Sequence, residues 1–97
     1  MSENSYIVTE CLSYFEQVLD WINSRYDNIA LIYRLFTINS SVHLEIKTVL
    51  FSSKHRKVIS EIYKYLVKSY RGKGIIEANY TEKLGKIALY AICKPNE

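Results

Sequence analysis

The sequence predicts an α+β fold, a two-layer sandwich in which two helices cover one face of a four-stranded antiparallel sheet. Two segments repeat apolar residues every three or four positions, the spacing of an amphipathic helix. Each segment is followed by two runs of strand-forming residues separated by turn residues. With 97 residues, 1–97 is expected to form a single domain. The order αββαββ then closes best as one sheet with both helices on one side.

The first helix is predicted over residues 8–26. Thr9 can cap its N-terminus, and Asp27-Asn28 favours a turn after it. The preceding segment 5–9 is rich in strand formers, so the periodicity leaves open a short strand or a first helical turn. One side of the helix carries the apolar residues Val8, Cys11, Leu12, Phe15, Val18, Leu19, Ile22 and Tyr26.

A β-hairpin is predicted next, with strands at 29–38 and 42–47 joined by the turn residues 39–41. The first strand is apolar on both faces. In the second, apolar and polar residues alternate, so one face is expected to be covered and the other exposed. The exposed side carries His43, Glu45, Lys47, Val49 and Phe51.

The second helix is predicted over 54–70, capped by Ser52 or Ser53 and stopped by Gly72 and Gly74. Strands at 75–81 and 86–93, joined by a turn over 82–85, form the second hairpin. The last strand is apolar on both faces, as expected of a central strand. The apolar stripe of the helix comprises Val58, Ile59, Ile62, Leu66 and Tyr70.

The order αββαββ resembles the ferredoxin-like fold βαββαβ with its first strand moved to the end of the chain. That resemblance implies that the second and fourth strands lie at the centre of the sheet. The alternative topology is a meander of two αββ units.

Composition bounds the protein class. Hydrophobic residues make up 48% and charged residues 24%, as in globular proteins. The longest apolar run, 87–93, falls far short of the about 20 residues of a membrane span. The first ten residues hold two glutamates and no basic residue, unlike a secretory signal. We therefore expect a cytoplasmic protein that does not enter the membrane.

Cys11 and Cys93 lie far apart in the sequence, without a CxxC pair. The geometry allows a disulfide between them, but we predict two reduced, packed thiols. Neither a metal site nor a cofactor is indicated. Ile and Lys are abundant and Gln occurs once, a composition typical of hyperthermophile proteins. In composition the chain resembles small proteins of AT-rich archaea and their viruses.

Charge is unevenly distributed along the chain. Residues 1–30 hold five acids and one base, a net of −4, whereas residues 54–73 hold seven bases and one acid, a net of +6. Helix N-termini attract anions through free N–H groups and the helix dipole. The sequence therefore predicts a non-enzymatic protein that binds nucleic-acid phosphates or an acidic protein surface. The predicted site comprises Ser53, Lys54, His55, Arg56, Lys57, Lys64, Lys68, Arg71 and Lys73.

The second face of the sheet suggests an alternative function. Two helices cover one face only, so apolar residues such as Ile32, Phe36, Tyr90 or Ile92 would be exposed, which is typical of an interface. This favours a protein-interaction module, for example a homodimeric viral or mobile-element inhibitor of a host nucleoprotein complex. Base stacking would also use these aromatic residues, but the glycine-aromatic motif of RNA-recognition domains is missing.

A third hypothesis is a small metal-dependent nuclease. Glu45-Ile46-Lys47 resembles the ExK half of the PD-(D/E)XK nuclease motif. That resemblance implies that Glu45 binds Mg²⁺ and Lys47 positions the attacking water. The family also requires an aspartate near the preceding strand, where this sequence offers only Asp27.

Overall fold

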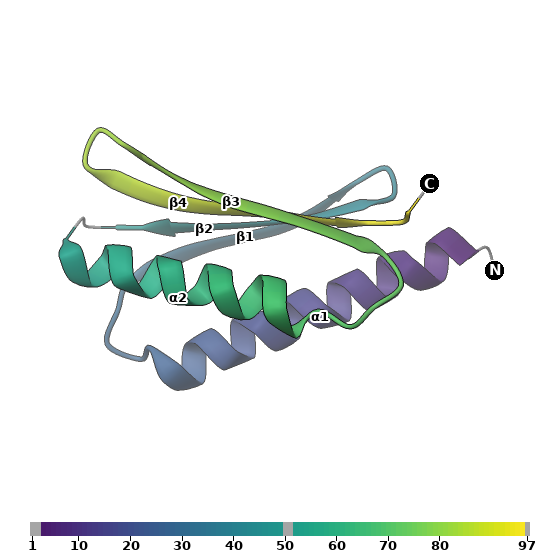
Figure 1. Cartoon of the computed structure of the whole chain (residues 1–97), viewed down its shortest axis with the longest axis horizontal. Helices are drawn as coiled ribbons and strands as arrows, with labels where there is room; N and C mark the ends of the chain where they lie inside the picture. The colour runs from purple at the N-terminus through teal and green to yellow at the C-terminus, as the bar shows by residue number, and fades with distance from the viewer. Residues whose placement is uncertain (1–2, 50–51, 97) are drawn as a thin grey trace.

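A computed structural model describes residues 3–49 and 52–96 of the chain. The elements follow the predicted order: α1 (Glu3–Arg25), β1 (Leu31–Ile38), β2 (Ser41–Thr48), α2 (Ser53–Ser69), β3 (Ile75–Lys83) and β4 (Lys86–Lys94). Figure 1 shows both helices on one side of the twisted sheet. The predicted α+β class, the element order and the two layers are therefore confirmed. Phe51, predicted on the exposed side of the second strand, lies outside the described residues.

The strand order is β1-β2-β4-β3, and every neighbouring pair is antiparallel. β2 and β4 thus occupy the centre, as the permuted ferredoxin-like arrangement implies, and the meander is wrong. The connection through α2 carries the chain from β2 across to the far edge of the sheet, so β4 can return between β2 and β3. In this central position the inner residues of β4 are buried, and Ala88, Tyr90 and Ile92 on its outer face are half-buried.

The core lies between the helices and the inner face of the sheet. Phe15, Val18 and Ile22 of α1 are fully buried, as are Ile59, Ile62 and Leu66 of α2. The alternation predicted for β2 is observed for Val42, Leu44 and Ile46, which are buried at 0% exposure. Inward residues of β4, namely Ile87, Leu89, Ala91 and Cys93, complete this core.

Several element boundaries differ from prediction. α1 begins at Glu3, so segment 5–9 is helical and Thr9 is not the cap. Its hydroxyl instead donates a hydrogen bond to the Ser5 carbonyl oxygen, 3.0 Å away within the helix. β3 extends to Lys83, which shortens the second hairpin turn to two residues. α2 ends at Ser69 because Tyr70 adopts an extended backbone, before either glycine.

Gly72 and Gly74 allow close approach of the chain rather than stopping the helix. A Cβ on Gly72 would lie 2.3 Å from Glu10 Oε2, and one on Gly74 would lie 2.6 Å from the Lys94 carbonyl oxygen. A side chain at Gly74 would therefore collide with the backbone of β4, whereas one at Gly72 would displace the Glu10 and Tyr70 side chains.

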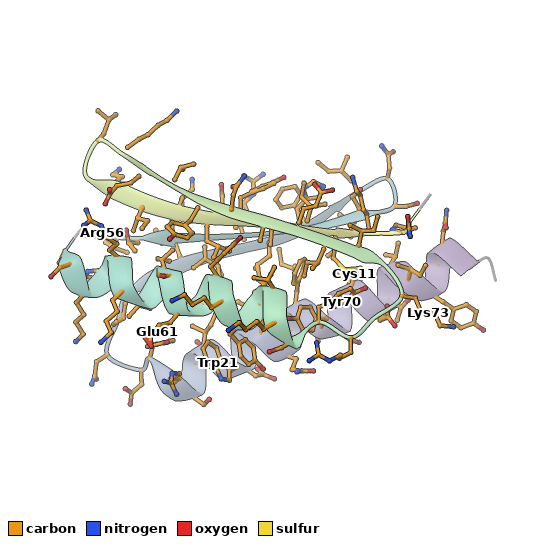
Figure 2. The ribbon with its side chains drawn as sticks, in the orientation of Figure 1. Cys11, Trp21, Arg56, Glu61, Tyr70 and Lys73 are labelled. Carbon is orange, nitrogen blue, oxygen red and sulfur yellow. A yellow bond between two sulfur atoms is a disulfide. The ribbon has the colours of Figure 1, made fainter. Side chains whose placement is uncertain are left out.

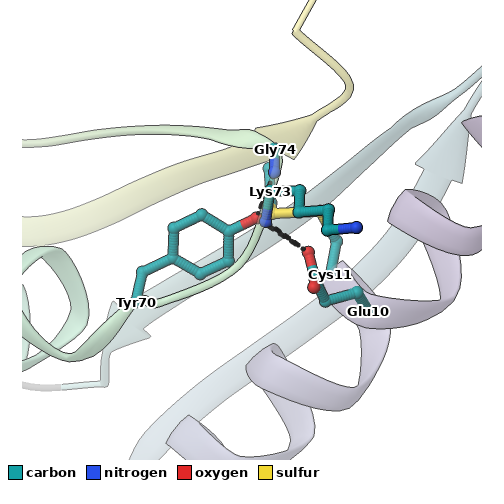
Figure 3. The surroundings of a disulfide bond; sticks show 6 residues. Glu10, Cys11, Tyr70, Lys73 and Gly74 are labelled. Atoms are coloured by element: carbon teal, nitrogen blue, oxygen red, sulfur yellow. Dashed lines mark hydrogen bonds between the residues drawn. A yellow bond between two sulfur atoms is a disulfide. The ribbon is translucent and has the colours of Figure 1, made fainter.

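The prediction of two reduced thiols is wrong in this structure, because Cys11 and Cys93 form a disulfide. It joins the buried side of α1 to β4, and both residues are fully buried. Figure 3 shows the segment that follows α2 folded over this bond. There Glu10 Oε2 accepts hydrogen bonds from the Lys73 backbone N–H at 2.9 Å and the Tyr70 hydroxyl at 3.3 Å. The two cysteines are 82 residues apart in the sequence, and only the fold brings them together.

Candidate functional site

The candidate site is the exposed side of α2. Its buried residues, Val58, Ile59, Ile62 and Leu66, face the sheet, so positions on the opposite side of the helix point outward. Lys57, Lys64 and Lys68 are all exposed. At 100° per residue they fall within about 40° of one another on the helix surface. The three lysines therefore form one basic face of α2.

Among the described residues, no ion pair involves Lys57, Lys64 or Lys68. Glu61 is four residues from Lys57 and three from Lys64, yet its carboxylate pairs with the Arg25 guanidinium of α1, 4.0 Å away. This cross-helix pair draws the single acidic residue of the face toward α1. Figure 2 shows Glu61 on the side of α2 that faces the end of α1.

The N-terminus of α2 differs in part from the predicted anion-binding corner. Ser52 is the N-cap, and its hydroxyl oxygen accepts a hydrogen bond from the His55 backbone N–H at 3.3 Å. The same oxygen shares a 2.6 Å hydrogen bond with His55 Nδ1, so the imidazole is held against the cap. Ser53 and Lys54 are exposed.

Arg56 is not a free cation. Its guanidinium binds the Glu82 carboxylate of β3, with Nη2 at 2.6 Å and Nε at 3.0 Å from one oxygen. A two-contact arginine pair is well oriented, although both side chains are partly exposed and screened by solvent. The pair attaches the first turn of α2 to the second hairpin.

The two remaining predicted residues lie beyond the helix. Arg71 Nη1 donates hydrogen bonds to the carbonyl oxygens of Lys68 at 2.6 Å and Tyr70 at 3.0 Å, so it caps the C-terminus of α2. Lys73 is exposed beside Glu10, to which its backbone N–H is bound. Neither residue shares the lysine face, because the chain leaves the helix at Tyr70. Burial raises the pKa of Tyr70, so its hydroxyl stays protonated and donates to Glu10.

A groove of about 620 Å³ runs between α2 and the second hairpin. Lys57 and Lys64 line its helix side, and Tyr80 lines its sheet side. Tyr80 is 41% exposed and contacts Tyr63 edge to face, with ring centroids 5.4 Å apart. The sequence did not indicate Tyr80, because only the packing of α2 against β3 brings it beside Tyr63.

Of the apolar residues predicted to be exposed on the outer face of the sheet, Ile32 is exposed, whereas Phe36, Tyr90 and Ile92 are half-buried. Ile32 is 53% and Ile38 is 52% exposed on β1. His43, predicted to be exposed, is buried at 8% because Phe36 stacks on its ring, with centroids 4.9 Å apart, and Tyr90 shares a hydrogen bond with Nδ1. By contrast, Tyr63 and Tyr65 of α2 pack at the edge of the core, and Tyr14 of α1 is buried within it.

The described residues provide no metal centre for a nuclease. The Glu45 carboxylate lies 3.6 Å from the Lys47 ammonium group. No group of three His, Cys, Asp or Glu side chains that could hold a metal ion occurs among residues 3–49 and 52–96. Asp27 lies in the turn between α1 and β1. The nuclease hypothesis therefore gains no geometric support.

Comparison with known proteins gives one informative similarity. The chain is 25% identical over 87 residues to uncharacterized protein 101 of Sulfolobus islandicus rod-shaped virus 1, covering 90% of this chain and 86% of that protein. No known family profile and no solved structure matches the chain. The protein is thus similar over most of its length to a small viral protein. In the part of the chain that the structure describes, none of the helices could cross a membrane.

Proposed function

We propose that this protein binds nucleic acid through the basic face of α2, with Lys57, Lys64 and Lys68 as the phosphate contacts. The observation that carries the proposal is that these exposed lysines share one helix side without an ion-pair partner among the described residues. Released counterions would supply most of the affinity, so binding should weaken steeply as salt rises. Lys54 and Ser53 extend the same surface to the N-terminus of the helix.

Matched charge removals test this proposal. Lys64→Gln with Lys68→Gln should weaken binding to a labelled DNA duplex and lower the slope of log K against log salt by about two, because two phosphate contacts are lost. Arg34→Gln with Lys94→Gln removes the same charge from the outer face of the sheet and should leave the slope unchanged. Fluorescence anisotropy at several salt concentrations measures both. Equal losses in the two variants, or none in the first, would reject the site.

The same face could bind an acidic protein instead, and the wild-type chain separates the two targets. Nucleic-acid binding predicts measurable affinity for DNA or RNA at low salt. If neither binds the wild type, the nucleic-acid proposal fails and an acidic protein surface becomes the target to search for.

A second candidate function is a homodimeric protein-interaction module, such as a viral inhibitor of a host nucleoprotein complex. Its support is the pair of half-exposed isoleucines on the outer face of β1 and the similarity to a viral protein. This function predicts a dimer of twice 11.4 kDa in light scattering that persists at high salt. Replacement of Ile32 and Ile38 by Ser should return the monomer mass, and a monomer at every concentration of wild type would exclude it.

A further inference from the structure

The turn of the second hairpin has an unusual residue at its tip. β3 ends at Lys83 and β4 begins at Lys86, and these two residues are paired, so the loop is only Leu84-Gly85. Both loop residues have positive φ, 53° for Leu84 and 71° for Gly85. Turns of this kind normally use Asn-Gly, Asp-Gly or Gly-Gly, because other side chains are strained in the left-handed region. In the other hairpin a positive φ of 56° falls on Asn39, a residue type that tolerates the left-handed region.

Leu84 gains nothing within the chain that would offset this strain. Its side chain is 100% exposed and contributes no packing to the core. A leucine that suits neither its backbone conformation nor its surroundings indicates a contact outside the chain.

The surroundings of Leu84 are basic. Lys83 and Lys86 are exposed on either side of it, and no ion pair involves them in the described part of the chain. Behind the turn, a hollow of about 490 Å³ is lined by both lysines together with Thr81 and Ala88. The two lysines complement an anionic surface, and the leucine between them complements an apolar one. Duplex DNA offers both, because its phosphate backbones flank a stack of base pairs.

The turn lies at the same end of the molecule as the start of α2. Figure 1 shows the hairpin extending away from the helices above this end, and the Arg56–Glu82 pair joins the two elements. The exposed Lys54 and Lys57 of α2 therefore lie at the same end of the molecule as the turn.

We infer that the β3–β4 turn is a wedge that inserts Leu84 between base pairs of duplex DNA while Lys83 and Lys86 hold the flanking phosphates. Apolar side chains inserted in this way partly unstack a base step and kink the duplex toward a wider contact with the protein. The inference rests on the proposed function, because α2 would supply the adjoining phosphate contacts.

Leu84→Asn tests the wedge, because folding and binding should respond in opposite directions. Asn-Gly suits the turn better than Leu-Gly, so the midpoint of thermal unfolding should rise. Affinity for a DNA duplex should fall by about tenfold or more, since a buried leucine contact is lost. The fluorescence of a duplex containing 2-aminopurine should increase when the wild type binds, because the base unstacks. It should stay low when the duplex is saturated with Leu84→Asn.

Further variants and probes separate this inference from the proposed function. Lys64→Gln with Lys68→Gln should weaken binding yet keep the 2-aminopurine signal at saturation. Unchanged duplex affinity of Leu84→Asn would overturn the wedge and leave the α2 proposal intact. A Leu84-dependent gain on vesicles of anionic phospholipid, or equal Leu84-dependent affinity for single-stranded DNA, would also overturn it. Lys83→Gln with Lys86→Gln should reduce the salt slope by about two.

Discussion

Tyr14 shows how a single side chain can connect the two helices and respond to pH. Its ring is buried, and its hydroxyl donates a hydrogen bond to the Leu66 carbonyl oxygen near the end of α2. Burial, assisted by the nearby Tyr65, raises the pKa of Tyr14 to about 12. A protonated donor is therefore retained in the folded chain at pH values where the unfolded chain would ionise.

The raised pKa of Tyr14 predicts a loss of stability at alkaline pH. The unfolded chain loses its proton near the ordinary value of 10.0, so the stabilisation is complete below that pH and disappears as pH rises toward about 12. At neutral pH, Tyr14→Phe should cost about 1 kcal/mol through the lost hydrogen bond. Urea unfolding followed by circular dichroism should show this difference shrinking above pH 10. A difference that is constant across the range would contradict the assignment.

Single residues also mark the limits of prediction from sequence. Alternation in β2 placed Val42, Leu44 and Ile46 in the core correctly, because period two depends only on the strand itself. The same alternation placed His43 in solvent, where Phe36 and Tyr90 of the neighbouring strands in fact cover it. Likewise, Glu61 meets Arg25 of the other helix rather than a lysine of its own. Contacts between elements decided both outcomes, and the periodicity of a single helix or strand carries no information about such contacts.

At the scale of elements, the Cys11–Cys93 bond attaches α1 to a central strand of the sheet. It closes a loop of most of the chain, which restricts the unfolded state strongly. Disulfides form mainly in oxidising compartments, and intracellular proteins of hyperthermophiles are a known exception.

Removal of this disulfide should destabilise the protein substantially. Cys11→Ala with Cys93→Ala should lower the free energy of unfolding by about 2–4 kcal/mol, measured by guanidinium denaturation. Adding a reductant should lower the stability of the wild type and leave the double variant unaffected. Two thiols titrating in the unfolded, unreduced wild type would show that the bond is absent.

Hairpins and helices were predictable as elements, whereas their exact ends were not. The two-residue turn at Leu84-Gly85 was expected to span 82–85, because leucine is not a turn residue and its presence there obscured the boundary. Leucine is strained in the left-handed backbone conformation of this turn. For that reason Leu84 did not indicate a turn in the sequence, and for the same reason it is a candidate for function.

At the scale of the whole molecule, the exposed sides of the two helices carry opposite charge. α1 exposes Glu16 and Asp20, and α2 exposes Lys57, Lys64 and Lys68. Sequence charge alone predicted an acidic and a basic helix, and the fold places them side by side beneath one sheet (Figure 1). A polyanion is attracted to α2 and repelled from α1, which would fix its orientation on the protein.

The most direct test of the α2 proposal is nuclear magnetic resonance mapping of the ¹⁵N-labelled protein titrated with a short DNA duplex. Our account predicts that backbone amide signals of 53–69 and of the turn at 83–86 shift together and return as salt is added. Signals of Glu16, Asp20 and Ile38 should stay in place. Shifts centred on Ile32 and Ile38, or no shift at low salt, would contradict a nucleic-acid interface on α2.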